Sequence, residues 1–517
     1  MLKALGILGT ASVAGSGTAL GAQLDSLVAA GRLSEVRSTR LFTQVKKLTA
    51  SDGAALDNFG VSVSVSADGS MALIGAHGSD DAGPGSGSAY VYDLSQDPPT
   101  ETKLTASDAA SGVQFAFAVS MSGDGNTALV GASGDNDAGI QSGAAYVYDL
   151  RQDPPTEMKL TASDAASGDL FGYAVSLSGD GNTALVGAHG SDDTDEYSGS
   201  AYVYDLCQDP PTETKFTASD AAGGAEFAFA VSVSTDGTTA LVGARGDDHT
   251  GEYSGSAYVY DLSQDPPTET KLTASDASAD DFFGSAVSVS GDGNTALVGA
   301  SGDDDAGTES GSAYVYDLCQ DPPAETKLTA GDAADGDLFG HDVSVSSDGT
   351  TALVGAWGNN DAGTESGSAY VYDLCQDPPA ETKLTASDAA ALDDFGISVS
   401  VNADGTTALI GAYTDDDNGR HSGSAYVFEL EQLAVFPEPI VLKNGKVVDP
   451  QDLDGDGLYE DLDGDGDVDG HDVSRLTQLE AAHRKGEIQL TNAQVVALDF
   501  DGDGEFTKKD IAAYRKR

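Results

Sequence analysis

Carboxylates spaced for calcium binding lie near the C-terminus of this chain of 517 residues. Between Asp461 and Asp472, oxygen-bearing side chains stand at positions 1, 3, 5, 9 and 12 of a twelve-residue run, and Gly466 stands at position 6. Calcium loops use this spacing because the ion needs several oxygen ligands and the glycine permits a sharp turn. The residue at position 7 contributes its backbone carbonyl. The first predicted loop therefore comprises Asp461, Asp463, Asp465, Asp467, Asp469 and Asp472.

A second run repeats this pattern, with candidate ligands Asp499, Asp501, Asp503, Glu505, Thr507 and Asp510. Apolar residues at helical spacing follow each loop, such as Leu476 and Leu479 after the first. A third run, with Asp452, Asp454 and Asp456, overlaps the first loop and has no helix of its own. Its separate occupation by calcium therefore stays open. The alternative for the whole segment is an acidic tail without bound ions.

One repeated position elsewhere in the chain carries aromatic and ionisable residues. The residue that follows a recurring Gly-Ala pair is, in turn, His77, Ser133, His189, Arg245, Ser301, Trp357 and Tyr413. We predict ligand binding at His77, His189, Arg245, Trp357 and Tyr413, with a glycan as the candidate ligand, because aromatic faces bind sugars and cations. Trp357 and Tyr413 would be the stacking residues. The alternative is drift at an unconstrained surface position.

These positions belong to units that recur every 56 residues without an insertion. A phenylalanine followed by glycine or alanine marks each unit, at Phe59, Phe115, Phe171, Phe227, Phe283, Phe339 and Phe395. Each unit contains four runs of β-strand character, which in the third unit are 171–178, 183–188, 201–206 and 215–219. Seven such units predict a mainly β fold, a seven-bladed β-propeller over residues 47–438 with the variable position around one mouth.

Closure of the ring can be predicted from the phase of the repeats. The run from Lys47 to Ser51 precedes the first marker, and no equivalent run follows the last unit. If this run is the outermost strand of a blade, it completes the seventh blade and leaves no exposed sheet edge.

The phenylalanine-glycine marker, the Gly-Ala pair and the Ala-Tyr-Val-Tyr run together resemble FG-GAP repeats, the units of the integrin alpha-subunit propeller. Calcium-binding members of that family carry several acids in the first hairpin. Here only one aspartate remains in each hairpin, as at Asp124 and Asp292, so we interpret these aspartates as turn residues. Ala116 and Ala228 replace the marker glycine, which alanine can do without strain only if the backbone needs no positive φ.

The C-terminal calcium loops, over residues 452–517, resemble a dockerin module. Dockerins also use aspartate at position 12, as Asp472 and Asp510 do here. The resemblance implies calcium as the cofactor and a cohesin-like protein partner, which positions 10 and 11 of each loop contact. These positions are Gly470-His471 in one loop and Lys508-Lys509 in the other, so a symmetric dual mode of binding is not expected.

Composition limits the classes of partner. The formal net charge is −60, so phosphate-rich nucleic acid and anionic membrane surfaces would be repelled. The carboxylates are spread along the repeats, which suits either a protein of saline surroundings or simply an acidic secreted protein. Cys207, Cys319 and Cys375 occupy the same position of different units, which predicts free surface thiols rather than a disulfide.

The remaining segments are predicted to connect or target these parts. Residues 1–22 resemble a weak signal peptide, with a disordered leader as the alternative, and no segment is suited to span a membrane. Residues 23–46 and 439–451 would be linkers. We expect a secreted or cell-surface binding or adhesion protein that is not an enzyme. The alternatives are a component of a cohesin–dockerin polysaccharide-degrading complex and a hydrolase with its active site in the propeller mouth.

Overall fold

The computed structural model describes residues 41–264, 266–431, 440–441 and 447–448. The chain divides into two compact units, of which one spans Phe42–Leu430. In the other unit, β29 (Ile440–Val441) pairs with β30 (Val447–Val448) in an antiparallel ladder. The predicted calcium loops, the leader and most of the predicted linkers lie outside the described residues. Among the described residues, no helix is long and apolar enough to cross a membrane.

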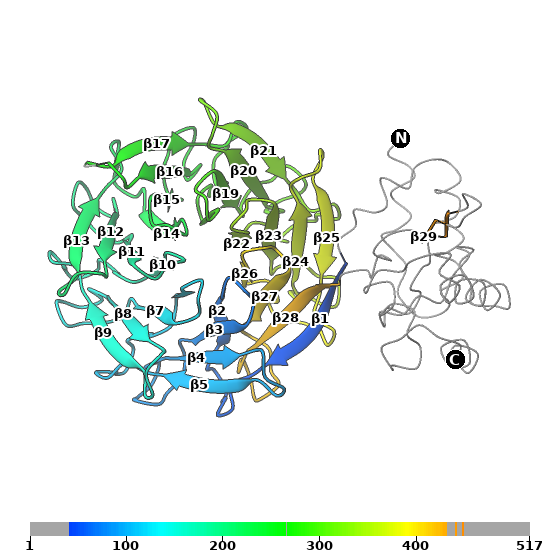
Figure 1. The fold of residues 1–517 in the computed structure, drawn as a ribbon. Helices are drawn as coiled ribbons and strands as arrows, with labels where there is room; N and C mark the ends of the chain where they lie inside the picture. Colours follow the sequence, from blue (N-terminus) through cyan, green and yellow to red (C-terminus); the bar gives the residue numbers. More distant parts are fainter. Residues whose placement is uncertain (1–40, 265, 432–439, 442–446, 449–517) are drawn as a thin grey trace. The chain divides into compact units, whose positions relative to one another are not determined.

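The larger unit is a ring of seven four-stranded antiparallel sheets (Figure 1). Blades 1 to 3 contain β2 (Phe59–Val65), β3 (Met71–Ala76), β4 (Ser88–Asp93) and β5 (Thr100–Leu104); β6 (Val119–Met121), β7 (Thr127–Ala132), β8 (Ala144–Asp149) and β9 (Thr156–Leu160); and β10 (Ala174–Leu177), β11 (Thr183–Ala188), β12 (Ser200–Asp205) and β13 (Thr212–Phe216). Blades 4 and 5 contain β14 (Phe227–Val233), β15 (Thr239–Ala244), β16 (Ser256–Asp261) and β17 (Thr268–Leu272); and β18 (Ala286–Val289), β19 (Thr295–Ala300), β20 (Ser312–Asp317) and β21 (Ala324–Leu328).

Blade 6 contains β22 (Val343–Val345), β23 (Thr351–Ala356), β24 (Ser368–Asp373) and β25 (Ala380–Leu384). Blade 7 contains β26 (Ser398–Val401), β27 (Thr407–Ala412) and β28 (Ser424–Glu431), and its fourth strand is β1 (Leu41–Leu48), with the order β1-β28-β27-β26. The seven-bladed propeller and its closure by the N-terminal strand are thus confirmed. The first strands of the blades, such as β10 and β14, lie nearest the centre of the ring (Figure 1).

Three local expectations need correction. The closing strand spans Leu41–Leu48 rather than Lys47–Ser51, because residues before the repeated motif also pair with β28. The fourth strand of blade 3 spans Thr212–Phe216, directly after the proline pair, rather than the expected 215–219. Pro211 lacks an N–H, but the residue that follows it can join the ladder at once.

The third correction concerns the alanines that replace the marker glycine. Ala116 and Ala228 have φ of 68° and 66°, close to the 85° of Gly172 at the same repeat position. The backbone therefore keeps its left-handed conformation and the alanines carry its steric cost. Packing over-determines this conformation, since Ala116 and Ala228 are both fully buried.

The core lies between neighbouring blades. Each marker phenylalanine is completely buried, and Phe115 packs edge-on against the rings of Tyr146 and Tyr148 at 5.5 and 6.1 Å. Its cluster also includes Leu73 and Val91 of blade 1, so the apolar faces of adjacent sheets interlock. Aromatic pairs in this geometry add to the free energy gained by burial.

Two further contacts join each blade to the next. Gly87 bridges to Phe115 of the following blade, and a Cβ at Gly87 would lie only 2.0 Å from the carbonyl oxygen of Phe115. The inner strands carry a serine whose hydroxyl accepts a hydrogen bond from the next inner strand. These bonds form a complete circle around the ring, at 2.9–3.1 Å. The backbone N–H donors and their serine acceptors are Met121 and Ser64, Leu177 and Ser120, Val233 and Ser176, Val289 and Ser232, Val345 and Ser288, Val401 and Ser344, and Val65 and Ser400.

Candidate functional sites

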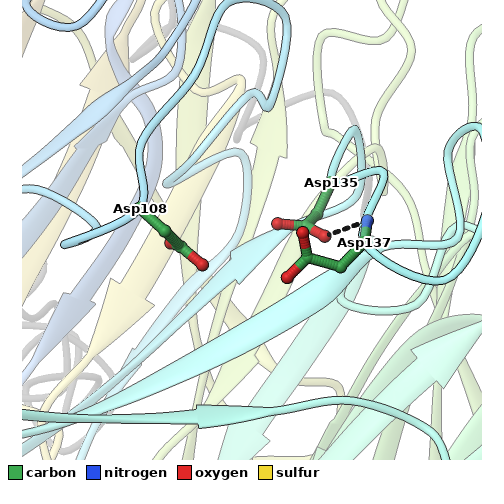
Figure 2. Close-up of side chains that lie close together, drawn as sticks. All are labelled: Asp108, Asp135 and Asp137. Carbon is green, nitrogen blue, oxygen red and sulfur yellow. Dashed lines mark hydrogen bonds between the residues drawn. The ribbon is translucent and has the colours of Figure 1, made fainter.

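Every blade holds a lysine ammonium inside a cluster of carboxylates, which we call the lysine cluster. In blade 2, Lys159 Nζ lies 2.7 Å from Asp108, 2.9 Å from Asp135 and 2.7 Å from Asp137. Figure 2 shows these three carboxylates, with the N–H of Asp137 donating to Asp135. The lysine comes from the outer strand β9, Asp108 from the crossover between blades, and Asp135 and Asp137 from the loop between β7 and β8.

The third element of each cluster is a tyrosine from the strand beside the lysine. Lys159 Nζ lies 5.3 Å from the centre of the Tyr146 ring, and the Tyr146 hydroxyl donates to Asp108 at 2.7 Å. The other blades repeat this arrangement with Lys47 on Tyr426, Lys103 on Tyr90, Lys215 on Tyr202, Lys271 on Tyr258, Lys327 on Tyr314 and Lys383 on Tyr370. The tyrosines are nearly inaccessible, so the ring and the carboxylates together form a preformed seat for a cation.

The electrostatics agree with an ion cluster rather than with isolated surface charges. Burial raises the pKa of Asp108, but its bonds with Lys159 and Tyr146 outweigh this and lower the pKa overall. For Lys159, burial lowers the pKa, and the bonds to the three aspartates raise it well above its usual value. Asp135 has a side-chain exposure of only 6%, so part of the cluster is shielded from water. Such charges need partners within the fold.

The second candidate site is the predicted mouth, where the inner strands begin on the face of the ring that carries the crossovers between blades. Three rings at the starts of consecutive inner strands meet there. Phe117 and Tyr173 lie 4.9 Å apart, and Tyr173 and Phe229 lie 5.1 Å apart, measured between ring centres. We call these three residues the aromatic arc. Their positions are taken by valine, serine, histidine and isoleucine in the other blades, so the arc is confined to blades 2 to 4.

Three of the predicted ligand residues contact this arc. His77 packs on Phe117 at 5.5 Å, and His189 packs on Tyr173 and Phe229 at 4.3 and 5.4 Å. The Arg245 guanidinium lies 3.5 Å from the centre of the Phe229 ring, and its Nε donates to Glu226 at 2.7 Å. The structure thus brings His77, His189 and Arg245 together through aromatic residues that the sequence analysis did not single out.

The other two predicted ligand residues lie in blades 6 and 7. Trp357 contacts His341 at 5.8 Å, and Tyr413 is half-buried near Asp394. The buried atoms Trp357 Nε1, His77 Nδ1 and His189 Nδ1 have no hydrogen-bond partner. Burial lowers the pKa of His189 to about 4 and that of His341 to about 4, so both imidazoles are neutral at neutral pH. The mouth therefore combines apolar rings and neutral imidazoles with the paired charges of Arg245 and Glu226.

Models of protein families match most of the chain. The FG-GAP repeat model matches residues 42–92, 99–148, 155–204, 211–260, 267–316, 324–372 and 380–428. This chain belongs to the FG-GAP repeat family. The type I dockerin model matches residues 459–517, so the FG-GAP propeller is followed by a C-terminal type I dockerin domain. A search of curated proteins gave no match.

The first hairpins of the FG-GAP blades use their aspartates to close the turn. Asp124 accepts hydrogen bonds from the Ser122 hydroxyl at 2.7 Å and from the backbone and side-chain amides of Asn126 at 3.0 and 2.8 Å. One carboxylate already engaged in this way does not provide the oxygen set that calcium needs. The hairpins therefore do not fit a calcium ion, which agrees with their interpretation as turns.

The lysine clusters were missed at the sequence level, although a signal was present. A lysine and an Ala-Ser-Asp or Ala-Gly-Asp run recur in every unit, and Asp135 and its counterparts follow the variable position by two residues. The three are far apart in sequence and only the blade fold joins them. The cysteines Cys207, Cys319 and Cys375 are exposed and free, as predicted. The predicted dockerin ligands lie outside the described residues.

Proposed function

We propose that the chain is an extracellular binding component of a cohesin–dockerin complex. Its dockerin would attach it to a cohesin, and its propeller would present a binding surface to a second partner. The observation that carries this proposal is the match of a type I dockerin domain over residues 459–517, C-terminal to seven matched FG-GAP repeats. Dockerins bind cohesin partners, so a propeller carrying one is suited to assembly beside other proteins.

Calcium would be the cofactor of the docking module. Type I dockerins bind calcium, and both loops of this chain place oxygen-bearing side chains at the ligand positions, with aspartate at position 12 in Asp472 and Asp510. The residues at positions 10 and 11 differ between the loops, Gly470-His471 against Lys508-Lys509. We therefore propose that one loop–helix face binds the cohesin better than the other.

The propeller would contribute recognition rather than catalysis, with the mouth as its ligand site. Support comes from the aromatic arc and from the neutral histidines His77 and His189 beside it. Arg245 is already paired with Glu226 and stacked on Phe229, so its charge is satisfied within the fold. The ligand class that suits such a site is an uncharged sugar of a polysaccharide, because aromatic rings contact its apolar face and neutral polar groups pair its hydroxyls.

Docking is tested by calorimetric titration of a purified type I cohesin module into the full chain. We expect binding in calcium and none in excess chelator, since chelation removes the ligand-held loop geometry. The paired substitutions Asp463→Ala and Asp501→Ala should abolish binding. The matched control is His189→Ser in the propeller, which carries the serine that other blades have at this position and should leave docking unchanged. Binding that persists in chelator would contradict the role of the calcium loops.

The mouth is tested with the full chain and soluble neutral polysaccharides, namely xylan, mixed-linkage β-glucan and galactomannan. Trp357 is the only tryptophan in the chain, so its fluorescence reports on the mouth. Binding should change its emission and should be lost in Tyr173→Val, which carries the valine that blade 1 has as Val61. Ile397→Val at the same position of blade 7 is the control. Release of reducing sugars during these titrations would favour the alternative of a hydrolase.

A further inference from the structure

The acidic clusters of the propeller are already occupied by a cation of the chain itself. Three oxygens from Asp108, Asp135 and Asp137 lie close enough to hold one metal ion, and Asp276, Asp303 and Asp305 form the same group in blade 5. Yet the ammonium of Lys159 lies within 2.9 Å of all three carboxylates in the first group. Lys327 fills the second group, at 2.5–2.9 Å.

The arrangement recurs in all seven blades, so it is a property of the repeat. Each lysine contacts the crossover aspartate at 2.6–2.8 Å, in the pairs Lys47–Asp388, Lys103–Asp52, Lys159–Asp108, Lys215–Asp164, Lys271–Asp220, Lys327–Asp276 and Lys383–Asp332. The loop between the second and third strands adds at least one more carboxylate in each blade. The lysine thus joins a crossover to a loop, which is a task that a bound metal performs in other folds.

The clusters differ in how many acids they contain. Three carboxylates surround the lysine in blades 2, 5 and 7, where the loop supplies the pairs Asp135 with Asp137, Asp303 with Asp305, and Asp415 with Asp417. The position that Asp135 occupies in blade 2 is occupied by Ser191 in blade 3 and by Asn359 in blade 6. Every cluster therefore contains the lysine ammonium, whereas the number of carboxylates differs between clusters.

We infer that a tethered lysine ammonium takes the place of a divalent cation in every blade, so that this FG-GAP propeller folds and keeps its shape without calcium. The hairpin aspartates are engaged in turns. Within the described residues, the two groups of three carboxylates that lie close enough to hold a metal ion are filled by Lys159 and Lys327. A calcium ion would have to displace an ammonium that cannot diffuse away, and the tether gives that ammonium a high effective concentration. Dependence on calcium would then be confined to the dockerin domain.

The decisive measurement is calorimetry of the full chain with calcium and with chelator, at one ionic strength. The midpoint temperature of the propeller transition should be the same in calcium and in chelator within about 1 °C. Calcium bound only to the folded propeller would stabilise it and raise this midpoint. A calcium-induced rise of the wild-type propeller transition by several degrees would overturn the inference. This measurement needs no variant, and it is independent of whether the chain binds a cohesin.

A set of variants tests the same inference by removing the tethered cation. Lys159→Met keeps the aliphatic stem and leaves three carboxylates without their cation, so we expect a lower melting temperature that calcium partly restores. Lys215→Met is the matched control in blade 3, where fewer acids surround the lysine, and calcium should restore less. Lys159→Arg keeps the charge and should stay insensitive to calcium. If Lys159→Met is folded and calcium does not raise its melting temperature, the seat is not a cation site and the inference fails.

Discussion

At the scale of single residues, one repeat position carries an acid that its counterparts in the other blades lack. Asp342 stands at the start of the inner strand of blade 6, where the other blades have serine or alanine. Its carboxylate accepts hydrogen bonds from the N–H of Val399 at 2.7 Å and of Val343 at 3.0 Å. Burial raises its pKa to about 6, and these two bonds offset only part of that effect. The folded protein therefore holds the proton of Asp342 more tightly than an ordinary aspartate would.

Replacing this acid should make the propeller more stable at neutral pH. Because the pKa of Asp342 is about 6 in the folded state, above the ordinary 3.8, the folded protein holds its proton more tightly than the unfolded chain. Stability is then lost as the pH rises from about 4 through 6. Asp342→Ser copies Ser62, which accepts from Val119 N at 3.0 Å. We expect a gain of about 1–2 kcal/mol at pH 7.

The pH profile supplies the control for this variant. Denaturant unfolding of Asp342→Ser and of the wild type should give equal free energies of unfolding below about pH 4, where the wild-type carboxyl is protonated in both states. A gain of equal size at every pH would instead indicate a change in packing.

At the scale of elements, ring closure depends on β1. This strand supplies Lys47, which bonds to Asp388 at 2.7 Å and to Asp415 at 3.0 Å, and its residue Leu48 is buried in the core between blades 7 and 1. It also departs from the other outer strands. Elsewhere a tyrosine donates to a glutamate of the outer strand, as Tyr92 does to Glu101 at 2.7 Å. Blade 7 has Phe428 in place of the tyrosine and Val45 in place of the glutamate. Because both polar groups are replaced together, no hydroxyl or carboxylate there lacks its partner.

Deleting residues 1–48 should therefore open the ring, whereas deleting residues 1–40 should not. The longer deletion exposes the edge of β28 and removes the cation of the blade 7 cluster, so we expect aggregation and loss of the cooperative propeller transition. The shorter deletion keeps β1 whole and is the matched control. Light scattering and calorimetry check both. A monomeric product of the longer deletion with an unchanged melting temperature would show that β1 is dispensable.

Much of this architecture could be predicted from the sequence because its signals are local and repeated. The phenylalanine marker, the strand runs and the phase of Lys47–Ser51 gave the blade number and the closure. The lysine cluster could not be derived in that way, since Asp108, Asp135 and Lys159 meet only after the crossover has folded over the blade. The φ of Ala116 stayed open at the sequence level for a similar reason, because packing against neighbouring strands overrides the preference of alanine.

At the scale of the whole molecule, net charge should make stability depend on salt. With a formal charge of −60, carboxylates repel one another across the surface, and the lysine clusters neutralise only a minority of them. Raising sodium chloride from 0.05 to 1 M, for which the Debye length falls from above ~10 Å to ~3 Å, should raise the melting temperature of the propeller. Thermal unfolding across this series is the measurement. A melting temperature that falls with salt would mean that the ion clusters outweigh the general repulsion.

The two parts of the chain should also separate in their response to chelation. The first dockerin loop crowds Asp461, Asp463, Asp465, Asp469 and Asp472 into twelve residues, and without a cation these charges repel. The short apolar runs that follow offer little surface to bury, so metal binding becomes folding free energy there. The propeller carries its own cations in Lys47 and its six counterparts, which no chelator removes.

Calorimetry of the full chain should accordingly show two transitions in calcium and only that of the propeller in chelator. Asp465→Ala together with Asp503→Ala should lower the number of calcium ions bound and should remove the dockerin transition even in calcium. Lys159→Arg, which keeps the propeller charge, is the control that should preserve both transitions. If the number of bound calcium ions is unchanged in the double variant, the ions are held elsewhere in the chain. The assignment of calcium to the dockerin loops would then have to be given up.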